Sequence, residues 1–185
     1  IASTEGKKSR AVVEYGIEAL KAVWHRGAVD ADGKTGDGAG IHVEIPKDFF
    51  IEKIQVTGHD YDNSEICVGM IFLPRNDYAA QENCKTIVES ELTKNNFSIY
   101  GWRQVPVNPK VLGEKAFQAM PEIIQVLFKS NDPNLLDKNL ERKIYETRKR
   151  IENKAFDASL NNFYICSISS KSIIYKGLYL AEAIS

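Results

Sequence analysis

The sequence predicts an α+β fold in which helices pack on antiparallel sheet. Segments with the helical apolar period and segments with strand character are interspersed, without the strict alternation of a doubly wound parallel fold. The last apolar segment, residues 163–177, reads as two strands around the turn Ser-Ser-Lys-Ser, which indicates a β-hairpin. The 185 residues show no internal repeat, low-complexity tract or linker. We therefore expect a single domain over residues 1–185.

The first half of the chain contains three expected helices and two expected strands. Val13, Ile17 and Leu20 recur at helical spacing, and Gly27 is expected to end that first helix. A run with almost no polar residue, residues 66–74, is typical of a strand buried on both faces. Asp77 is the expected N-cap of the helix that follows. The expected elements are helices at residues 9–27, 47–56 and 77–96, and strands at residues 41–46 and 66–74, with residues 24–40 forming a loop.

The second half of the chain predicts two strands, one long helix and the closing hairpin. The strands are expected at residues 97–107 and 122–130, and the helix at residues 131–156. The positively charged residues between Lys138 and Lys154 are interleaved with glutamates, which favours a solvated helix face with i,i+4 ion pairs over a nucleic-acid-binding face. The inward positions of this helix are Leu140, Ile144, Ile151 and Ala155.

Composition excludes several classes of protein. A net charge of −1 argues against nucleic acid or an anionic membrane as the main partner. No apolar run reaches the roughly 20 residues that span a bilayer, and no signal peptide is recognisable. The cysteines Cys67, Cys84 and Cys166 form no metal-ligand pattern and predict buried free thiols in a cytoplasmic protein. His42 and His59 stand alone, so we expect no metal site.

Glycines and charges concentrate in residues 24–40, "WHRGAVDADGKTGDGAG". A phosphate-binding loop runs from strand to glycine loop to helix, whereas here a helix precedes and a strand follows. An EF-hand calcium loop beginning at Asp30 is excluded at three positions. Lys34, Thr35 and Ile41 stand where the motif requires an acidic or Asn ligand, a glycine and a glutamate. The remaining interpretations are a long solvated turn and the wall of a binding site.

The residue types of this segment suit an amino-acid pocket. The guanidinium of Arg26 could bind a carboxylate with two hydrogen bonds, and the carboxylate of Asp37 could bind an ammonium group. Thr35 and His25 are polar neighbours, and the glycines would let backbone amides approach a ligand closely. The three cysteines have no histidine partner suggested by position, so the residues offer no nucleophile.

Three segments together carry a resemblance to a known family. They are "ALKAVWHRGAVDADGKTGDGAGIHVEIP", "IYGWRQVPV" and "FYICSISSKSIIYKG". The chain resembles, over its whole length, the N-terminal class II glutamine amidotransferase domain of the large (alpha) subunit of bacterial glutamate synthases, most closely the NADPH-dependent type. The resemblance implies the αββα sandwich of N-terminal nucleophile hydrolases, of which this chain would be the N-terminal part.

The resemblance also implies a reaction and its partners. L-Glutamine is hydrolysed by an N-terminal cysteine whose own α-amino group acts as base, and the ammonia passes to a second site where 2-oxoglutarate is aminated and reduced. That second site, with FMN and an iron–sulfur cluster, lies in later domains of the same large subunit. A small NADPH-oxidising subunit is a further expected partner. No cofactor is expected within residues 1–185.

The resemblance assigns roles to residues of this chain. Arg26 corresponds to the arginine that binds the glutamine α-carboxylate, and the expected pocket wall consists of His25, Gly27, Thr35, Gly36 and Asp37. The family's cysteine would lie just before Ile1 and its oxyanion-hole Asn-Gly beyond Ser185. Because both groups contribute orders of magnitude in rate, we expect no glutaminase activity from this chain alone, which reads as a fragment.

Two alternatives to the glutaminase fragment remain open. The chain could be a non-catalytic module that binds glutamine or glutamate through Arg26. It could also be a stand-alone amidotransferase relative that serves another synthase, although the run "TGDGAG" argues against this. Binding of glutamine by the isolated chain would favour the module.

Overall fold

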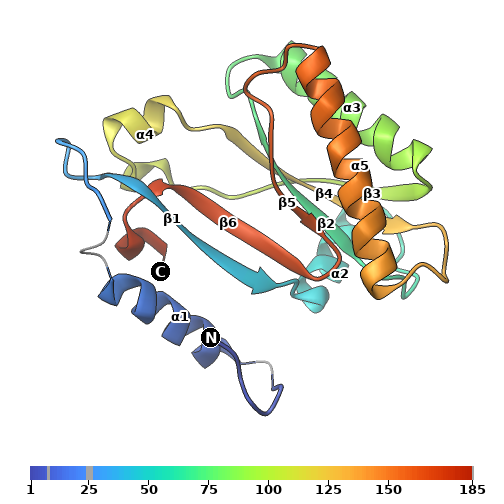
Figure 1. The fold of residues 1–185 in the computed structure, drawn as a ribbon, viewed down its shortest axis with the longest axis horizontal. Helices are drawn as coiled ribbons and strands as arrows, with labels where there is room; N and C mark the ends of the chain where they lie inside the picture. The colour runs from blue at the N-terminus through green and yellow to red at the C-terminus, as the bar shows by residue number, and fades with distance from the viewer. Residues whose placement is uncertain (8, 24–26, 185) are drawn as a thin grey trace. The chain divides into compact units, whose positions relative to one another are not determined.

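The computed structural model describes residues 1–7, 9–23 and 27–184. Within it the chain forms two compact units (Figure 1). Unit 1 comprises Ile1–Val43, Val107–Met120 and Ile174–Ser185, and unit 2 comprises Glu44–Pro106 and Pro121–Ile173. Both contain helices and antiparallel strands, so the fold is mixed α+β. The single domain expected over residues 1–185 stays a prediction.

Unit 2 is built on a four-stranded antiparallel sheet with the order β3-β4-β2-β5. Helices α3 and α5 lie side by side against this sheet, and α2 contacts β3 (Figure 1). The strands are β2 (Cys67–Leu73), β3 (Phe97–Gln104), β4 (Glu122–Ser130) and β5 (Tyr164–Ser169), and the helices are α2 (Lys47–Val56), α3 (Tyr78–Lys94) and α5 (Asp137–Asp157).

Helices α2 and α3 of unit 2 lie where the sequence predicts, but the expected start of α5 at residue 131 is wrong. Helix α5 begins at Asp137, because the residues before it form a turn in which the Asn134 N–H donates to the Asp132 carboxylate. The Asp77 carboxylate accepts a hydrogen bond of 2.9 Å from the Ala80 N–H and caps α3, which ends at Asn95. Along α5 the expected inward residues Leu140, Ile144, Ile151 and Ala155 are all buried. Both helices therefore present an apolar stripe to the sheet, as their periodicity predicts.

One core cluster joins the sheet of unit 2 to α3 and α5. Strand β2 is buried along nearly its whole length, as predicted for residues 66–74. Its ladder with β4 runs from the pair Cys67 and Phe128 to the pair Leu73 and Glu122. The buried cluster consists of Cys67, Ile71, Leu73, Cys84, Val88, Leu92, Phe97, Ile124, Val126, Phe128, Leu140, Ile144, Ile151, Ile165 and Ile168. Burial of this apolar surface is the main stabilising contribution in unit 2.

Strands β1 and β6 form a separate two-stranded sheet. Most of this sheet belongs to unit 1, which also holds α1 packed against the short helix η3. The bounds are α1 (Arg10–Ala22), β1 (Thr35–Glu44), η2 (Pro109–Val111), α4 (Glu114–Gln118), β6 (Ser172–Tyr179) and η3 (Ala181–Ile184). The sequence did not predict η2 or α4.

Two expected boundaries near the N-terminus are wrong. Helix α1 ends at Ala22, five residues before Gly27, and residues 24–26 lie outside the described residues. Strand β1 begins at Thr35, so the run Thr-Gly-Asp-Gly-Ala-Gly is strand, although we expected a loop up to residue 40. Its glycines pair with β6: a Cβ at Gly36 would lie 2.7 Å from the Tyr179 carbonyl oxygen. Close approach between two strands therefore accounts for glycines that suggest a loop in the sequence.

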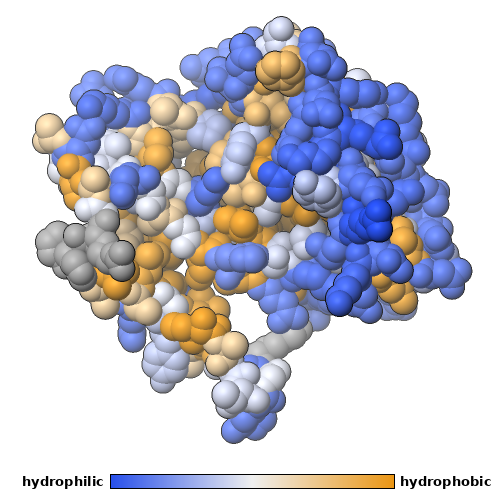
Figure 2. All heavy atoms as spheres, in the orientation of Figure 1, coloured by the Kyte–Doolittle hydropathy of each residue, from blue (hydrophilic) through white to orange (hydrophobic). Residues whose placement is uncertain are grey.

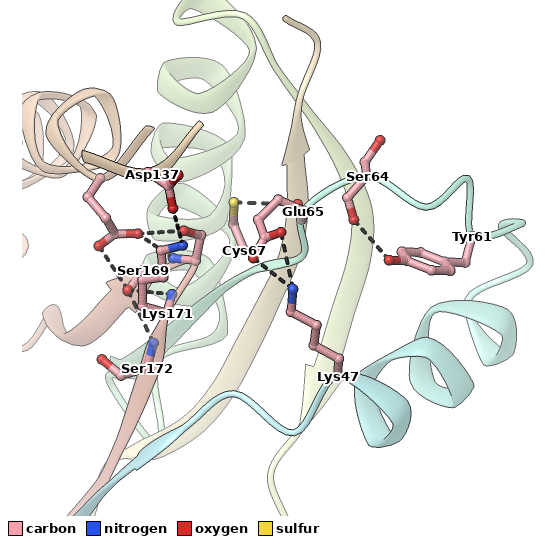
Figure 3. A network of polar contacts seen from close by, with 11 residues as sticks. Lys47, Tyr61, Ser64, Glu65, Cys67, Asp137, Ser169, Lys171 and Ser172 are labelled. Atoms are coloured by element: carbon pink, nitrogen blue, oxygen red, sulfur yellow. Dashed lines mark hydrogen bonds and ion pairs between the residues drawn. The ribbon is translucent and has the colours of Figure 1, made fainter. Parts of the chain in front are cut away.

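The expected hairpin at residues 163–177 is also wrong. Strand β5 pairs with β2, whereas β6 pairs with β1, so the chain changes sheet at the turn Ser169–Ser172. In a two-residue hairpin the Ser172 N–H would bind the Ser169 carbonyl. Here it donates to the Ser169 hydroxyl oxygen at 3.3 Å (Figure 3). That hydroxyl itself donates to the carboxylate of Glu141 on α5 at 2.9 Å. Helix α5 thus holds the turn in a conformation other than that of a hairpin.

The surface of unit 2 agrees with the solvated helix face predicted for α5. Arg142 pairs with Glu146 and Arg148 with Glu152, both at i,i+4 spacing. Figure 2 shows mainly hydrophilic residues over α3 and α5. Within the described part of the chain, no helix combines the length and the apolar character needed to cross a membrane.

Candidate functional site

Residues 27–37 fold as a short β-hairpin, which we call the glycine hairpin. The Asp37 N–H donates to the Ala28 carbonyl at 3.1 Å, and the Asp30 N–H donates to the Thr35 carbonyl at 2.9 Å. Val29 and Gly36 form an antiparallel bridge between these two bonds. The second arm continues directly into β1. The glycine hairpin is therefore an ordered extension of the β1–β6 sheet.

The carboxylate of Asp32 organises the tip of the glycine hairpin. Its Oδ1 accepts the backbone N–H groups of Lys34 at 2.9 Å and Thr35 at 2.7 Å, and its Oδ2 accepts the Thr35 hydroxyl at 2.6 Å. These hydrogen bonds, led by that of the Thr35 hydroxyl, lower the pKa of Asp32 to about 2. Gly33, with φ of +67°, supplies the left-handed residue of the turn. Asp32 is thus ionised at neutral pH and fixes Thr35.

The first turn of α4 supports the glycine hairpin from a distant part of the sequence. Lys115 forms an ion pair of 2.6 Å with Asp30, and its hydrogen bond lowers the pKa of that carboxyl. The Ala116 N–H donates to the Thr35 hydroxyl oxygen at 3.5 Å. At Gly113 the backbone is so close that a Cβ would lie 2.2 Å from the Thr35 hydroxyl oxygen. No sequence signal reveals this contact, because residues 113–116 carry no motif.

The structure brings together four of the six residues predicted for the site. Gly27 lies at an exposed bend, next to Ala28, which pairs with Asp37. Thr35 and Gly36 are buried, while the carboxylate of Asp37 is exposed on β1. His25 and Arg26 lie outside the described residues, and their placement stays a prediction. The glycine hairpin can therefore present the exposed carboxylate of Asp37 and the exposed backbone at Gly27 to a ligand.

The three cysteines are buried and form no disulfide, as the sequence predicts. Burial raises the pKa of the Cys67 thiol far above its ordinary value and raises that of Cys84 to about 11. Cys166 is 5% exposed within β5. A buried, protonated thiol is a poor nucleophile, because the thiolate is the reactive form. Among the described residues, no three His, Cys, Asp or Glu side chains are placed to hold a metal ion.

Unit 2 has a shallow hollow on its surface. It lies at the C-terminal ends of α3 and α5, and Lys154 and Lys94 pair there with the buried Glu91. Cations at helix C-termini stabilise the helix dipole, which gives these lysines a structural role. The hollow is lined by Glu91, Lys94, Asn95, Arg150, Asn153 and Lys154.

Comparison with known proteins identifies the family. The family model described as "Glutamine amidotransferases class-II" matches residues 1–185. The chain is 52% identical over 185 residues to the glutamate synthase [NADPH] large chain of Azospirillum brasilense, covering 100% of this chain and 12% of that protein. It is 37% identical over 186 residues to ferredoxin-dependent glutamate synthase 1 of Arabidopsis thaliana, covering 100% of this chain and 11% of that protein.

A third relative is the chloroplastic ferredoxin-dependent glutamate synthase of Spinacia oleracea, which is 36% identical over 187 residues. All of this chain and 11% of that protein are covered. The chain thus spans about an eighth of the length of these curated relatives, and the whole of it falls within one family. On this evidence, the chain belongs to the class II glutamine amidotransferase family.

Proposed function

We propose that these 185 residues are part of the glutaminase domain of a glutamate synthase large chain. The observation that carries the proposal is the family match over residues 1–185 together with 52% identity, without loss of coverage, to a bacterial glutamate synthase. The name of that relative favours NADPH as the electron donor, although other relatives are named ferredoxin-dependent. The substrate of this domain is L-glutamine, and the products are glutamate and ammonia.

In the proposed reaction, the glycine hairpin binds the amino-acid end of glutamine. Arg26 binds the α-carboxylate with two parallel hydrogen bonds, and Asp37, exposed on β1, binds the α-ammonium. Gly27, Thr35 and Gly36, with His25, form the wall between them. Fixing both charged groups of the substrate orients its side-chain amide toward the nucleophile.

The proposed chemistry is acyl transfer through a thioester. A thiolate attacks the side-chain carbonyl carbon, a C–S bond forms, the C–N bond breaks, and nitrogen leaves as ammonia after it takes a proton. Water then hydrolyses the thioester and releases glutamate. Cys67, Cys84 and Cys166 are all buried, so we assign the nucleophile to a cysteine outside residues 1–185. We therefore propose that this 185-residue polypeptide does not hydrolyse glutamine by itself.

The rest of the enzyme forms a further part of the proposal. The two antiparallel sheets support membership of the αββα sandwich of N-terminal nucleophile hydrolases. FMN and an iron–sulfur cluster would act on 2-oxoglutarate in later domains, and a small subunit would oxidise NADPH. We assign none of the described residues to these groups, because the three cysteines are buried in separate elements. Free thiols support a cytoplasmic location.

Covalent labelling tests the proposal. A chain extended at both ends from its parent gene would be treated with a diazo-ketone analogue of glutamine and analysed by mass spectrometry. We expect one adduct, on a cysteine other than Cys67, Cys84 and Cys166, that disappears in Arg26→Ala. The matched control is Arg10→Ala, because Arg10 lies exposed on α1 and forms an i,i+4 ion pair with Glu14.

Two results would overturn the glutaminase assignment. The first is an extended chain that acquires no adduct. The second is an adduct that persists in Arg26→Ala as it does in Arg10→Ala. Titration calorimetry of the 185-residue chain with glutamine would then decide whether it is a binding module, which requires measurable heat of binding without release of ammonia.

A further inference from the structure

We propose that the first turn of α4, with Gly113 at its N-cap, positions the glycine hairpin to bind glutamine. The close contact of Gly113 with the hairpin fixes the position of the hairpin, and Asp32 transmits this contact to Thr35. The proposal rests on the proposed function and deepens it. None of these residues is assigned to touch the substrate. They act through Thr35 and the strand that continues from it.

The first step in the argument is the density of contact at Thr35. Its hydroxyl donates to the Asp32 carboxylate at 2.6 Å and lies 3.5 Å from the Ala116 N–H, and its side chain is buried. A Cβ on Gly113 would lie 2.2 Å from this hydroxyl oxygen and 2.6 Å from the Thr35 nitrogen. Real Cβ contacts are never this short. Residue 113 therefore has to be glycine if the hairpin keeps this position.

The backbone conformation of Gly113 shows that contact, and not flexibility, demands glycine. Its φ of −73° and ψ of 168° are extended values that any residue can adopt. Alanine at this position would be unstrained by itself and would act only by pushing against Asp32 and Thr35. Gly113→Ala is thus a specific probe of the contact between α4 and the glycine hairpin.

The second step compares the two contacts between α4 and the glycine hairpin, which are the ion pair of Lys115 and the close approach of Gly113. The ion pair of Lys115 with Asp30 has a lysine side chain that is 71% exposed. Exposed pairs of this kind contribute little because water and salt screen them. The contact of Gly113 with Asp32 and Thr35 is packed and partly buried, so it dominates. We therefore expect Gly113→Ala to have a large effect and Lys115→Met a small one.

The third step connects the tip of the hairpin to the substrate. Thr35, which Asp32 holds, is followed directly by Gly36 and Asp37, and the Asp37 N–H binds Ala28 next to Gly27. Displacing Thr35 therefore moves both arms. Glutamine would then bind only the fraction of molecules that retains the competent hairpin, and its apparent affinity would fall by that fraction.

Steady-state kinetics of the full-length enzyme test the proposal. Inserting one methyl group at this distance is expected to reduce the competent fraction to about a tenth, so KM for glutamine in Gly113→Ala rises about tenfold. The rate with ammonium salt in place of glutamine stays at the wild-type value, because free ammonia bypasses the hairpin. The matched control is Gly16→Ala in α1, where a Cβ meets nothing within 4 Å. It is expected to leave both rates unchanged.

A second pair of variants keeps the proposal testable if Gly113→Ala does not fold and loses both rates. Asp32→Asn retains a side-chain oxygen that can accept the backbone N–H groups of Lys34 and Thr35, whereas Asp32→Ala removes every acceptor at this position. We expect KM for glutamine to rise in the alanine variant and to rise clearly less in the asparagine variant. Equal KM values for the two variants would overturn the proposal.

The outcomes separate this inference from the proposed function. A wild-type enzyme that releases no glutamate from glutamine removes the glutaminase assignment itself. If the wild-type enzyme is active and the Gly113→Ala variant folds with an unchanged KM for glutamine, only the positioning role of α4 is refuted. A rise in KM for Lys115→Met as large as that for Gly113→Ala would also contradict it, because the ion pair would then dominate.

Discussion

Replacing Glu141 with alanine should destabilise unit 2 through the turn that joins β5 to β6. The Ser170 N–H and hydroxyl both donate to Glu141 Oε1 at 2.7 Å, and the Ser169 hydroxyl donates to Oε2 at 2.9 Å. Ser170 is 1% exposed, so water cannot replace the lost acceptor. A buried donor left without a partner costs about 1–3 kcal/mol, and two such donors predict a loss of about 2–6 kcal/mol in the free energy of unfolding.

Glu141→Gln is the matched control for this prediction. The two bonds from Ser170 share one carboxylate oxygen, and the single carbonyl oxygen of glutamine can occupy that place. Glutamine should therefore cost about 1 kcal/mol or less. Urea unfolding followed by tryptophan fluorescence, to which Trp102 in β3 contributes, measures both values. Equal losses for alanine and glutamine would refute the reasoning, since they would show that the charge or the helix position matters and the shared acceptor does not.

Two further predictions concern unit 2. The hydrogen bond from Lys129, together with those from Ser64 and Tyr100, holds the pKa of the Asp62 carboxyl well below its ordinary value of 3.8. Because the pKa of Asp62 is lower in the folded state, this stabilisation is present above about pH 3.8 and is lost as the pH falls below that value. Asp62→Asn should therefore make the free energy of unfolding depend less on pH in the acid range. Urea midpoints of the variant that fall between pH 7 and pH 3 as steeply as those of the wild type would contradict this. At Gly69 a Cβ would lie 2.7 Å from Val126 Cγ1, so Gly69→Ala should lower the free energy of unfolding by about 1–3 kcal/mol. Adding Val126→Ala should offset part of that loss, because it removes the methyl group that the new Cβ meets. If the losses of the two single variants simply add in the double variant, in thermal or urea unfolding, the contact is contradicted.

The sequence predicted most of unit 2, because local signals and packing agree there. Asp77 places α3 almost to the residue, and the apolar stripe through Leu140 and Ile144 gives the buried face of α5, although that helix begins six residues after its expected start. The unbroken apolar run of β2 is buried on both sides. In these elements the period of the sequence, the cap and the burial all favour the same structure.

Unit 1 was harder to predict because its structure depends on contacts between distant residues. The glycines at positions 36 and 40 suggest a loop until Tyr179 and Tyr175 of β6 are placed beside them. The support that Gly113 gives to Thr35 has no local signature for the same reason. The turn at Ser169–Ser172 fits a hairpin by its spacing, and contacts with other elements, such as those of Glu141 on α5, decide otherwise.

The pairing of β1 with β6 has a consequence for the time course of folding. Residues 35–44 and 172–179 lie near opposite ends of these 185 residues, so their ladder closes a very long loop of chain. Loop-closure entropy must be overcome before such contacts become favourable, and ladders of this kind form late. The arm that carries Asp37 is continuous with this ladder. Competence to bind substrate would then arise only after unit 2 has folded, which makes the glycine hairpin a reporter of completed folding.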